Sequence, residues 1–221
     1  MTSRGAGPTA ALAGIPAGLQ AQGIWAGRRQ LFIRFAAEAE TATMYSAAAL
    51  ATEISKAKSR SSFHSISIAG RDPLANTDYI RAAFNGASET LPTMLDCDGQ
   101  RPEAIGELKP VLTLMQVTIE GPALADPVRV DGAVRSIRAA ADAGLQHALV
   151  LGPDERTSDA VLLRIVEQAH GVGPATMIVV HPAAGSAVDR DRRWTSLIER
   201  SAAVHHDVRL AIRIPAPTGM R

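Results

Sequence analysis

The chain has 221 residues, of which 46% are hydrophobic and 4% are aromatic, so its length fits one domain, residues 1–221, with a sizeable apolar core. Its 23 Lys and Arg nearly balance its 22 Asp and Glu, which leaves no electrostatic reason to expect nucleic acid or an anionic membrane as a partner. One cysteine excludes an internal disulfide framework, and no apolar run approaches the roughly 20 residues of a membrane span, so we expect a cytoplasmic protein.

Segments typical of strands and of helices alternate along the chain. The stretch 63–69 (FHSISIA) has the two-residue period of a strand, and 130–143 is an amphipathic helix that ends at Gly144. Its buried face is expected to carry Val130, Val134, Ile137 and Ala141. We expect strands at 31–36, 63–69, 93–97, 111–119, 148–151, 177–180 and 208–214, and helices at 46–58, 78–84, 102–108, 130–143, 160–170 and 193–204.

This alternation, with short connections, favours an α/β fold with a parallel sheet and crossover helices. Six or seven strand–helix units suit an incomplete barrel better than a closed barrel of eight units. In such folds the chemistry lies where strands end and loops begin, so these positions hold the candidate functional residues.

The residues at the strand ends do not by themselves form a recognisable catalytic set. Glu38, Asp72, Asp96 and Glu120 could form an acidic metal site, but loop carboxylates are more often solvated. His181 could be a ligand or a general base, although a lone histidine at a strand end is more often structural.

The remaining reactive side chains are expected to be inert. Cys97 stands between two acidic residues, which disfavour its thiolate. His205 and His206 are adjacent and so cannot form the i, i+4 metal pair of a helix. The chain also lacks the glycine-rich phosphate loops and the nucleophile elbow.

Five segments resemble, in order and spacing, the motifs of one enzyme family. They are 19–23 with 27–36 (LQAQG and GRRQLFIRFA), 64–74 (HSISIAGRDPL), 95–99 (LDCDG), 179–182 (VVHP) and 208–219. Together they resemble the 7-carboxy-7-deazaguanine synthases, which are radical S-adenosylmethionine (SAM) enzymes of queuosine and archaeosine biosynthesis. The resemblance covers nearly the whole chain and implies a homodimer and an incomplete (β/α)6-type partial TIM barrel of the radical SAM type.

The resemblance also implies positions for the family's cofactors, which are a [4Fe–4S] cluster, SAM and Mg²⁺. The three cluster cysteines correspond to Glu38, Ala42 and Tyr45, and the SAM-binding turn corresponds to Gly70, Arg71, Asp72 and Pro73. Positions that match the family's substrate contacts are Gln20, Gln22, Gly23, Arg34, Asp98, Gly99, Thr118, Glu120, His181 and Arg213.

The chain departs from the family where the family does its chemistry. Cluster irons need thiolate ligands, and no cysteine precedes Cys97. Arg71 replaces a glycine that allows close approach of SAM in the family. We therefore expect no cofactor, and a catalytically silent relative that acts as a binding or partner module.

Such a module would pair with itself or with an active paralogue, or bind a pterin-like or purine-like small molecule. Two alternatives remain open. One is an enzyme with a new, non-radical activity that uses some of Glu38, Arg71, Asp72, Glu120, His181 and Arg213. The other is an enzyme that carries the family activity, in line with its overall similarity.

Overall fold

The computed structural model of the protein describes residues 7–87, 91–183, 188 and 190–212. It is an α/β structure with one mixed, mostly parallel sheet of ten strands. The strands are β1 (Thr9–Gly14), β2 (Ala17–Leu19), β3 (Arg29–Phe35), β4 (Thr43–Ser46), β5 (Ser65–Gly70), β6 (Thr93–Cys97), β7 (Leu114–Glu120), β8 (Gln146–Gly152), β9 (Met177–Val180) and β10 (Val208–Leu210).

Five α-helices and three short 3₁₀ helices connect the strands of the described chain. They are α1 (Ala47–Arg60), α2 (Thr77–Asn85), α3 (Pro127–Asp142), α4 (Asp159–His170) and α5 (Arg192–Ala202), with η1 (Pro73–Asn76), η2 (Pro102–Leu108) and η3 (Gly121–Ala125). None of the helices in the described part of the chain is long and apolar enough to cross a membrane.

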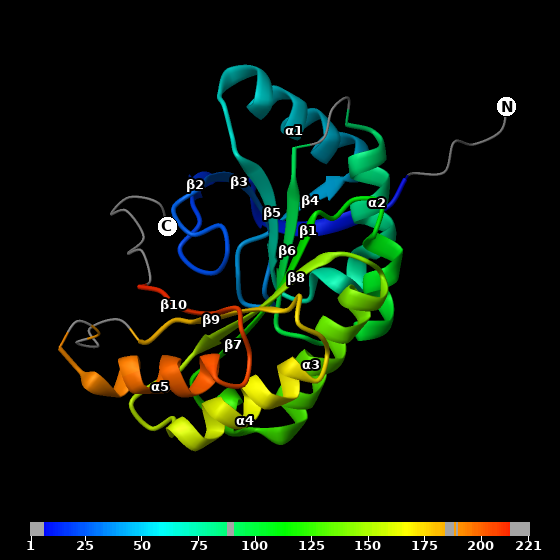
Figure 1. The fold of residues 1–221 in the computed structure, drawn as a ribbon. Coiled ribbons are helices and arrows are strands. Elements are labelled where there is room, and N and C mark those ends of the chain that lie inside the picture. Colours follow the sequence, from blue (N-terminus) through cyan, green and yellow to red (C-terminus); the bar gives the residue numbers. More distant parts are fainter. Residues whose placement is uncertain (1–6, 88–90, 184–187, 189, 213–221) are drawn as a thin grey trace, which may run out of the picture.

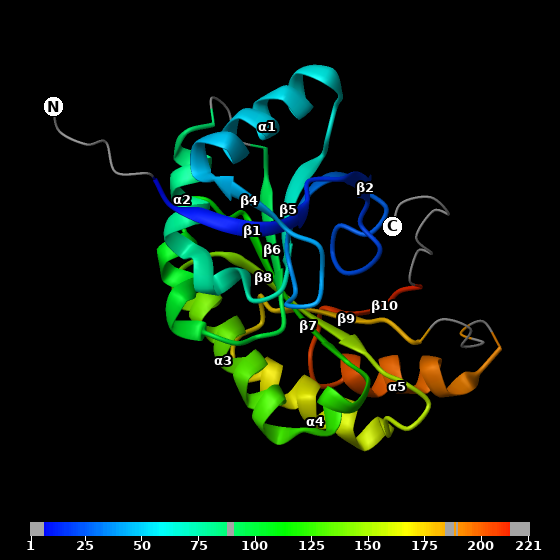
Figure 2. The ribbon, with the colours of Figure 1, turned by 180° about the vertical axis from the view of Figure 1, so that it is seen from behind.

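The parallel strands lie side by side in the order in which they occur in the sequence. The order across the sheet is β10-β9-β8-β7-β6-β5-β3, and every pairing within this run is parallel. Because right-handed crossovers between successive neighbours all return over the same face, the helices gather on one side of the sheet. Figures 1 and 2 show α1 to α5 along this outer side.

The main core lies between the sheet and these helices. It contains Ile33 and Ile68 of the strands together with Ile54, Ile137 and Leu197 of the helices, all at most 1% exposed. Burial of this apolar surface is the main stabilising contribution to such a fold.

The opposite, inner face of the sheet is covered in part by the 20–28 loop, which connects β2 to β3. Ile24 and Trp25 of this loop pack against Met94, Leu114 and Ala148. Backbone hydrogen bonds between Gln20 and Arg28 and between Gly27 and Gln20 close the loop. Because side chains alternate along a strand, Asp96 on β6 and Gln116 and Thr118 on β7 also lie on the inner face.

Most helix boundaries are close to those expected from the sequence, because local capping sets them. The side chain of Ser158 accepts a hydrogen bond from the amide of Val161 at the start of α4, and Ser46 does the same for Ala49 in α1. Gly144 follows the C-cap of α3 and has a φ of +73°, a left-handed conformation that favours glycine.

The predicted buried face of α3 is partly wrong. Val130 and Ile137 are buried, but Ala133, Ser136 and Ala140 complete the face, and Val134 is only half-buried. The segment 102–108 is a 3₁₀ helix rather than an α-helix, and the strand expected at 208–214 ends at Leu210, with 213 and 214 outside the described residues.

Three strands near the amino terminus were not predicted from the sequence. The first strand was expected at 31–36, but β1 and β2 precede it, and β4 lies between that strand and the helix expected at 46–58. β1 pairs antiparallel with both β3 and β4, so these strands extend the sheet beyond its parallel part. Ala and Gly dominate β1 and β2, and their low strand propensity explains why the pattern was not recognised.

Candidate functional site

Three polar side chains meet on the inner face, on the neighbouring strands β6 and β7. The carboxylate of Asp96 accepts a hydrogen bond from the Nε2 of Gln116 at 3.1 Å and one from the hydroxyl of Thr118 at 2.8 Å. Gln116 is fully buried, whereas Asp96 and Thr118 are half-buried. The strands therefore hold a carboxylate in a fixed orientation at a position that solvent or a small molecule can reach.

Backbone amides of the 20–28 loop form hydrogen bonds with Gln116 and with His181. The amide of Ile24 donates to the Oε1 of Gln116 at 3.3 Å, and the amide of Gly23 donates to the Nε2 of His181 at 2.9 Å. Gln116 thus uses both ends of its side chain, one for the loop and one for Asp96. The loop and the carboxylate are held by one polar network, which we call the inner-face network: Gly23, Ile24, Asp96, Gln116, Thr118 and His181.

Gly23 is the point at which the loop comes closest to the sheet. Its φ is +81°, in the region that favours glycine, and a Cβ at this position would overlap the side-chain amide of Gln116. Only glycine lets the backbone lie against Gln116 in this way.

His181 follows β9 and is 1% exposed. Because its Nε2 accepts the hydrogen bond from Gly23, the neutral ring carries its proton on Nδ1. Burial lowers the pKa of His181 from its ordinary value, which favours this neutral form. The Nδ1 has no hydrogen-bond partner within the described part of the chain.

Two further buried polar atoms on neighbouring strands also lack a partner among the described residues. They are the Oε1 of Gln30 on β3 and the hydroxyl of Ser67 on β5. The register places Phe32 opposite Ser67, so Gln30 and Ser67 share the inner face. Buried polar groups normally have a partner, so these atoms are candidate contacts for a bound molecule or for water.

The turn that corresponds to the family's SAM-binding turn lies beyond β5, and its charged side chains are paired. Asp72 has a left-handed backbone conformation. Its two carboxylate oxygens accept hydrogen bonds from the Nε of Arg101, at 3.0 Å for Oδ1 and 2.9 Å for Oδ2. Arg71 reaches Glu38 at 3.8 Å, and both side chains are exposed. Gly70 must be glycine because a Cβ there would overlap the backbone of Phe35, and Pro73 begins η1.

The predicted substrate-contact positions divide into three groups, of which the first two lie in the loop and inner-face network and against α3. Gln20, Gln22 and Gly23 belong to the 20–28 loop, and Thr118 and His181 belong to the inner-face network. Asp98 and Gly99 instead face α3: Asp98 binds Arg129 at 3.0 Å, and Gly99 accepts a hydrogen bond from Ser136. Their role in this structure is to hold the loop after β6 against that helix.

The other predicted positions are peripheral or lie outside the structure. Arg34 pairs with Glu40 at 3.0 Å and is exposed. Glu120 is exposed at the end of β7, next to Gly152. Arg213 lies outside the described residues.

The positions that correspond to the cluster cysteines do not fit an iron–sulfur cluster. Glu38 and Ala42 are exposed on the connection after β3, and Tyr45 lies within β4, where it pairs with Ala10 and packs against the main core. Cys97 is buried in the main core, on the side of the sheet that faces the helices and away from the inner face. Burial raises the pKa of its thiol to about 12. Its thiol is therefore protonated and unsuited to bind a metal.

The acidic metal site considered from the sequence is not formed by the described residues. Glu38, Asp72 and Asp96 each have a different partner, namely Arg71, Arg101 and the Gln116–Thr118 pair. Nowhere in the described chain do three or more His, Cys, Asp and Glu side chains gather closely enough to hold a metal ion.

Comparison with known proteins adds no family to this picture. No protein-family model matches the chain, and no curated protein sequence matches it significantly. The residues of the site therefore carry the functional argument.

Gln116 was not predicted as a site residue from the sequence, and Asp96 was predicted only as a possible metal ligand. Gln116 lies inside the apolar run 111–119, where a long polar side chain needs a hydrogen-bonding reason to be buried. A glutamine inside an apolar strand was therefore the sequence feature that could have identified Gln116 as a site residue.

Proposed function

We propose that this protein is a catalytically silent relative of the 7-carboxy-7-deazaguanine synthases, which binds a pterin-like or purine-like small molecule on the inner face of an incomplete barrel. The chain-order arrangement of the parallel strands, with helices on one side only, supports a partial barrel of the radical SAM type. The inner-face network occupies the side of the sheet on which such barrels bind their ligands.

One observation carries this proposal, the anchored carboxylate of Asp96. Purines and pterins present adjacent N–H groups in the plane of the ring, and a carboxylate accepts two such donors side by side. Gln116 and Thr118 fix the orientation of this acceptor, so little ordering is required when a ligand binds. The buried polar atoms of Gln30, Ser67 and His181 that have no partner among the described residues add polar groups on the same side.

The residues do not support radical chemistry. A [4Fe–4S] cluster is held by thiolates, and the positions that would hold it carry Glu, Ala and Tyr. We therefore assign no step to a cluster, to SAM or to Mg²⁺, and the family activity is the weakest of the alternatives.

The proposal includes self-association or pairing with an active paralogue, and a cytoplasmic location. The single buried cysteine suits a reducing compartment. The experiment for pairing is sedimentation of the purified chain alone and with an intact synthase.

The test of ligand binding is calorimetric titration of the tag-free protein with guanine, 7-deazaguanine and a reduced pterin. We expect saturable binding of at least one compound, and an affinity at least tenfold lower, or about 1.4 kcal/mol, in Asp96→Asn, which keeps the shape but loses the charge. Asp98→Asn is the matched control, because Asp98 is an aspartate two residues away that faces Arg129 instead.

The proposal is contradicted if none of the three compounds binds or if Asp98→Asn weakens binding as much as Asp96→Asn. The second candidate, a non-radical enzyme, is favoured by the buried His181, whose Nδ1–H has no partner among the described residues and can donate a hydrogen bond to a reacting group. Mass spectrometry of the bound compound after incubation separates the two: an unchanged compound supports the binding module, and a converted compound supports the enzyme.

A further inference from the structure

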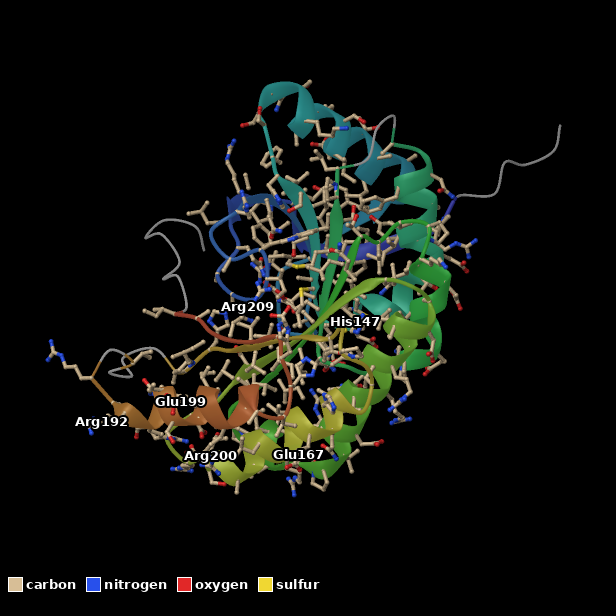
Figure 3. The ribbon with its side chains drawn as sticks, viewed as in Figure 1. His147, Glu167, Arg192, Glu199, Arg200 and Arg209 are labelled. Carbon is tan, nitrogen blue, oxygen red and sulfur yellow. The ribbon has the colours of Figure 1, made fainter. Side chains whose placement is uncertain are left out.

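A second polar network lies away from the inner-face network, where α4 and α5 end. His147 on β8 (Figure 3) is 5% exposed, and its Nδ1 donates to the carbonyl of Leu145 at 2.9 Å. Its Nε2 therefore accepts a hydrogen bond from the hydroxyl of Thr176, at 3.1 Å. The carbonyl of Thr176 in turn accepts a hydrogen bond from the Nε2 of His205 at 2.6 Å.

This arrangement determines which nitrogen of His205 is available. Since a carbonyl can only accept, the Nε2 of His205 carries the proton and its Nδ1 presents a lone pair. That Nδ1 faces the Nδ1 of His170 at 3.3 Å, with the two rings at 75° to each other. Two imidazole nitrogens thus converge from separate elements.

The separation of these nitrogens matches one edge of a tetrahedral metal site. Zinc binds imidazole nitrogen at about 2.0–2.1 Å, so two such ligands at the tetrahedral angle are about 3.3–3.4 Å apart. A metal ion bound to both nitrogens would take the place of the proton in their hydrogen bond.

The surroundings of His205 are those of a metal ligand. A ligating histidine usually donates its second ring N–H to a carbonyl or carboxylate, which fixes its orientation and makes it a stronger ligand. Thr176 supplies that carbonyl, and His147 holds the side chain of Thr176. Since His205 is 1% exposed, its ring is held in place before any ion binds.

The helices favour a positive charge at the same point. His170 is the last residue of α4, and His205 follows the end of α5, so the negative ends of both helix dipoles lie near the paired rings. His170 is exposed, which leaves the outer side of the pair open to water. Glu167, one turn earlier on α4, lies on the outer surface, and Asp207 is paired with Arg209 (Figure 3).

We propose that His170 and His205 form a two-histidine site for a divalent transition metal ion, Zn²⁺ in the first instance, with water completing the tetrahedron. The site rests on these distances alone and is independent of the proposed small-molecule function. With two protein ligands rather than four, we expect weaker binding than at a structural zinc site, but saturable below millimolar Zn²⁺.

The test is calorimetric titration of the tag-free protein with ZnCl₂. We expect one Zn²⁺ per chain in the wild type and at least tenfold weaker binding in His170→Ala, a change at an exposed position that leaves the fold intact. His206→Ala is the matched control, since His206 is an exposed histidine next to His205 and outside the pair; its affinity should equal that of the wild type.

Nitrogen-15 NMR of the wild-type imidazoles gives a readout that does not depend on any variant. Zn²⁺ should shift the Nδ1 resonances of His170 and His205 and leave those of His64 and His206 in place. Absence of saturable binding below millimolar Zn²⁺, equal binding by His170→Ala, or a shift at His206 instead of the pair would each overturn the proposal.

Discussion

Gly23 and Gln116 meet where the 20–28 loop crosses the inner face, and this contact leaves no room for a methyl group. The positive φ of Gly23 costs an alanine about 1–2 kcal/mol, and its Cβ would also displace the side chain of Gln116. The loop, Gln116 and Asp96 are therefore coupled, and a change at Gly23 reaches the carboxylate through one intermediate side chain.

We expect Gly23→Ala to lower the free energy of unfolding by about 2–3 kcal/mol in urea denaturation. Gly106→Ala is the control, because a Cβ at this exposed position meets nothing within 4 Å. Its stability should change by less than about 0.5 kcal/mol. Equal stability of Gly23→Ala and the wild type would show that the loop does not lie against Gln116.

His181 makes stability depend on pH in a defined direction. Burial lowers its pKa in the folded state below the ordinary value of 6.5, so the unfolded chain binds more protons between the two pKa values. The stability that depends on neutral His181 is complete above pH 6.5 and is lost as the pH falls toward the folded-state pKa.

The measurement is urea unfolding at pH values from 7.5 to 5.5, for the wild type and for His181→Gln, whose amide can still accept the hydrogen bond from Gly23. We expect the wild type to lose more stability than the variant as the pH falls. The pKa of the half-buried His64 is also lowered, mainly by burial. Its contribution to the pH dependence of stability is the same in both proteins and cancels in the difference. Parallel pH profiles would be incompatible with a buried, neutral His181.

At the residue scale, the sequence predicted part of the site. The family resemblance named Gly23 and Thr118, and the strand-end position also named His181; all three belong to the inner-face network. The sequence did not single out Gln116, because the apolar neighbours of this residue dominate the pattern. It also could not show that Asp98 turns to α3 while Asp96 faces the other side, since that depends on where β6 ends.

At the scale of elements, β4 explains why the segment 37–46 differs from a cluster-binding loop. Its backbone pairs with β1 from Thr43 to Ser46, which fixes Tyr45 against the main core, while the side chain of Glu38 is 89% exposed. Three thiolates would have to converge on one cluster, and these positions are held in different surroundings.

We therefore expect that the triple variant Glu38→Cys, Ala42→Cys and Tyr45→Cys does not assemble a [4Fe–4S] cluster when it is treated anaerobically with iron and sulfide. The measurement is iron content and visible absorbance, with the wild type treated in parallel. A full complement of cluster iron in the variant alone would mean that this segment adopts the loop conformation and that β4 is not a stable strand.

Elements with a strong pattern were predicted well, and elements of small residues were not. The helix at 160–170 and the strands at 93–97 and 177–180 agree with the structure because caps and apolar runs define them locally. β1 and β2 consist largely of Ala and Gly, and they are strands because β3 and β4 pair with them, which is tertiary information. The 3₁₀ form of η2 likewise includes Gly106 in its middle, where an α-helix is disfavoured.

At the scale of the whole molecule, alternation of strands and helices predicted the α/β class and the parallel pairing of successive strands. It did not reveal the antiparallel extension formed by β1, β2 and β4, or that the 20–28 loop folds over the inner face. These features set the site, because they determine which face of the sheet is covered and by what. The structure thus combines a parallel sheet in chain order with a polar network on its inner face and a buried, protonated thiol on the other.

The most direct test of a scaffold without radical chemistry is anaerobic reconstitution of the tag-free wild type with iron and sulfide, read out as iron bound per chain and cleavage of SAM. We expect no stoichiometric cluster and no cleavage, because the segment 37–46 contains no cysteine and Cys97 is buried. A brown protein with one [4Fe–4S] cluster per chain that cleaves SAM reductively would contradict this expectation.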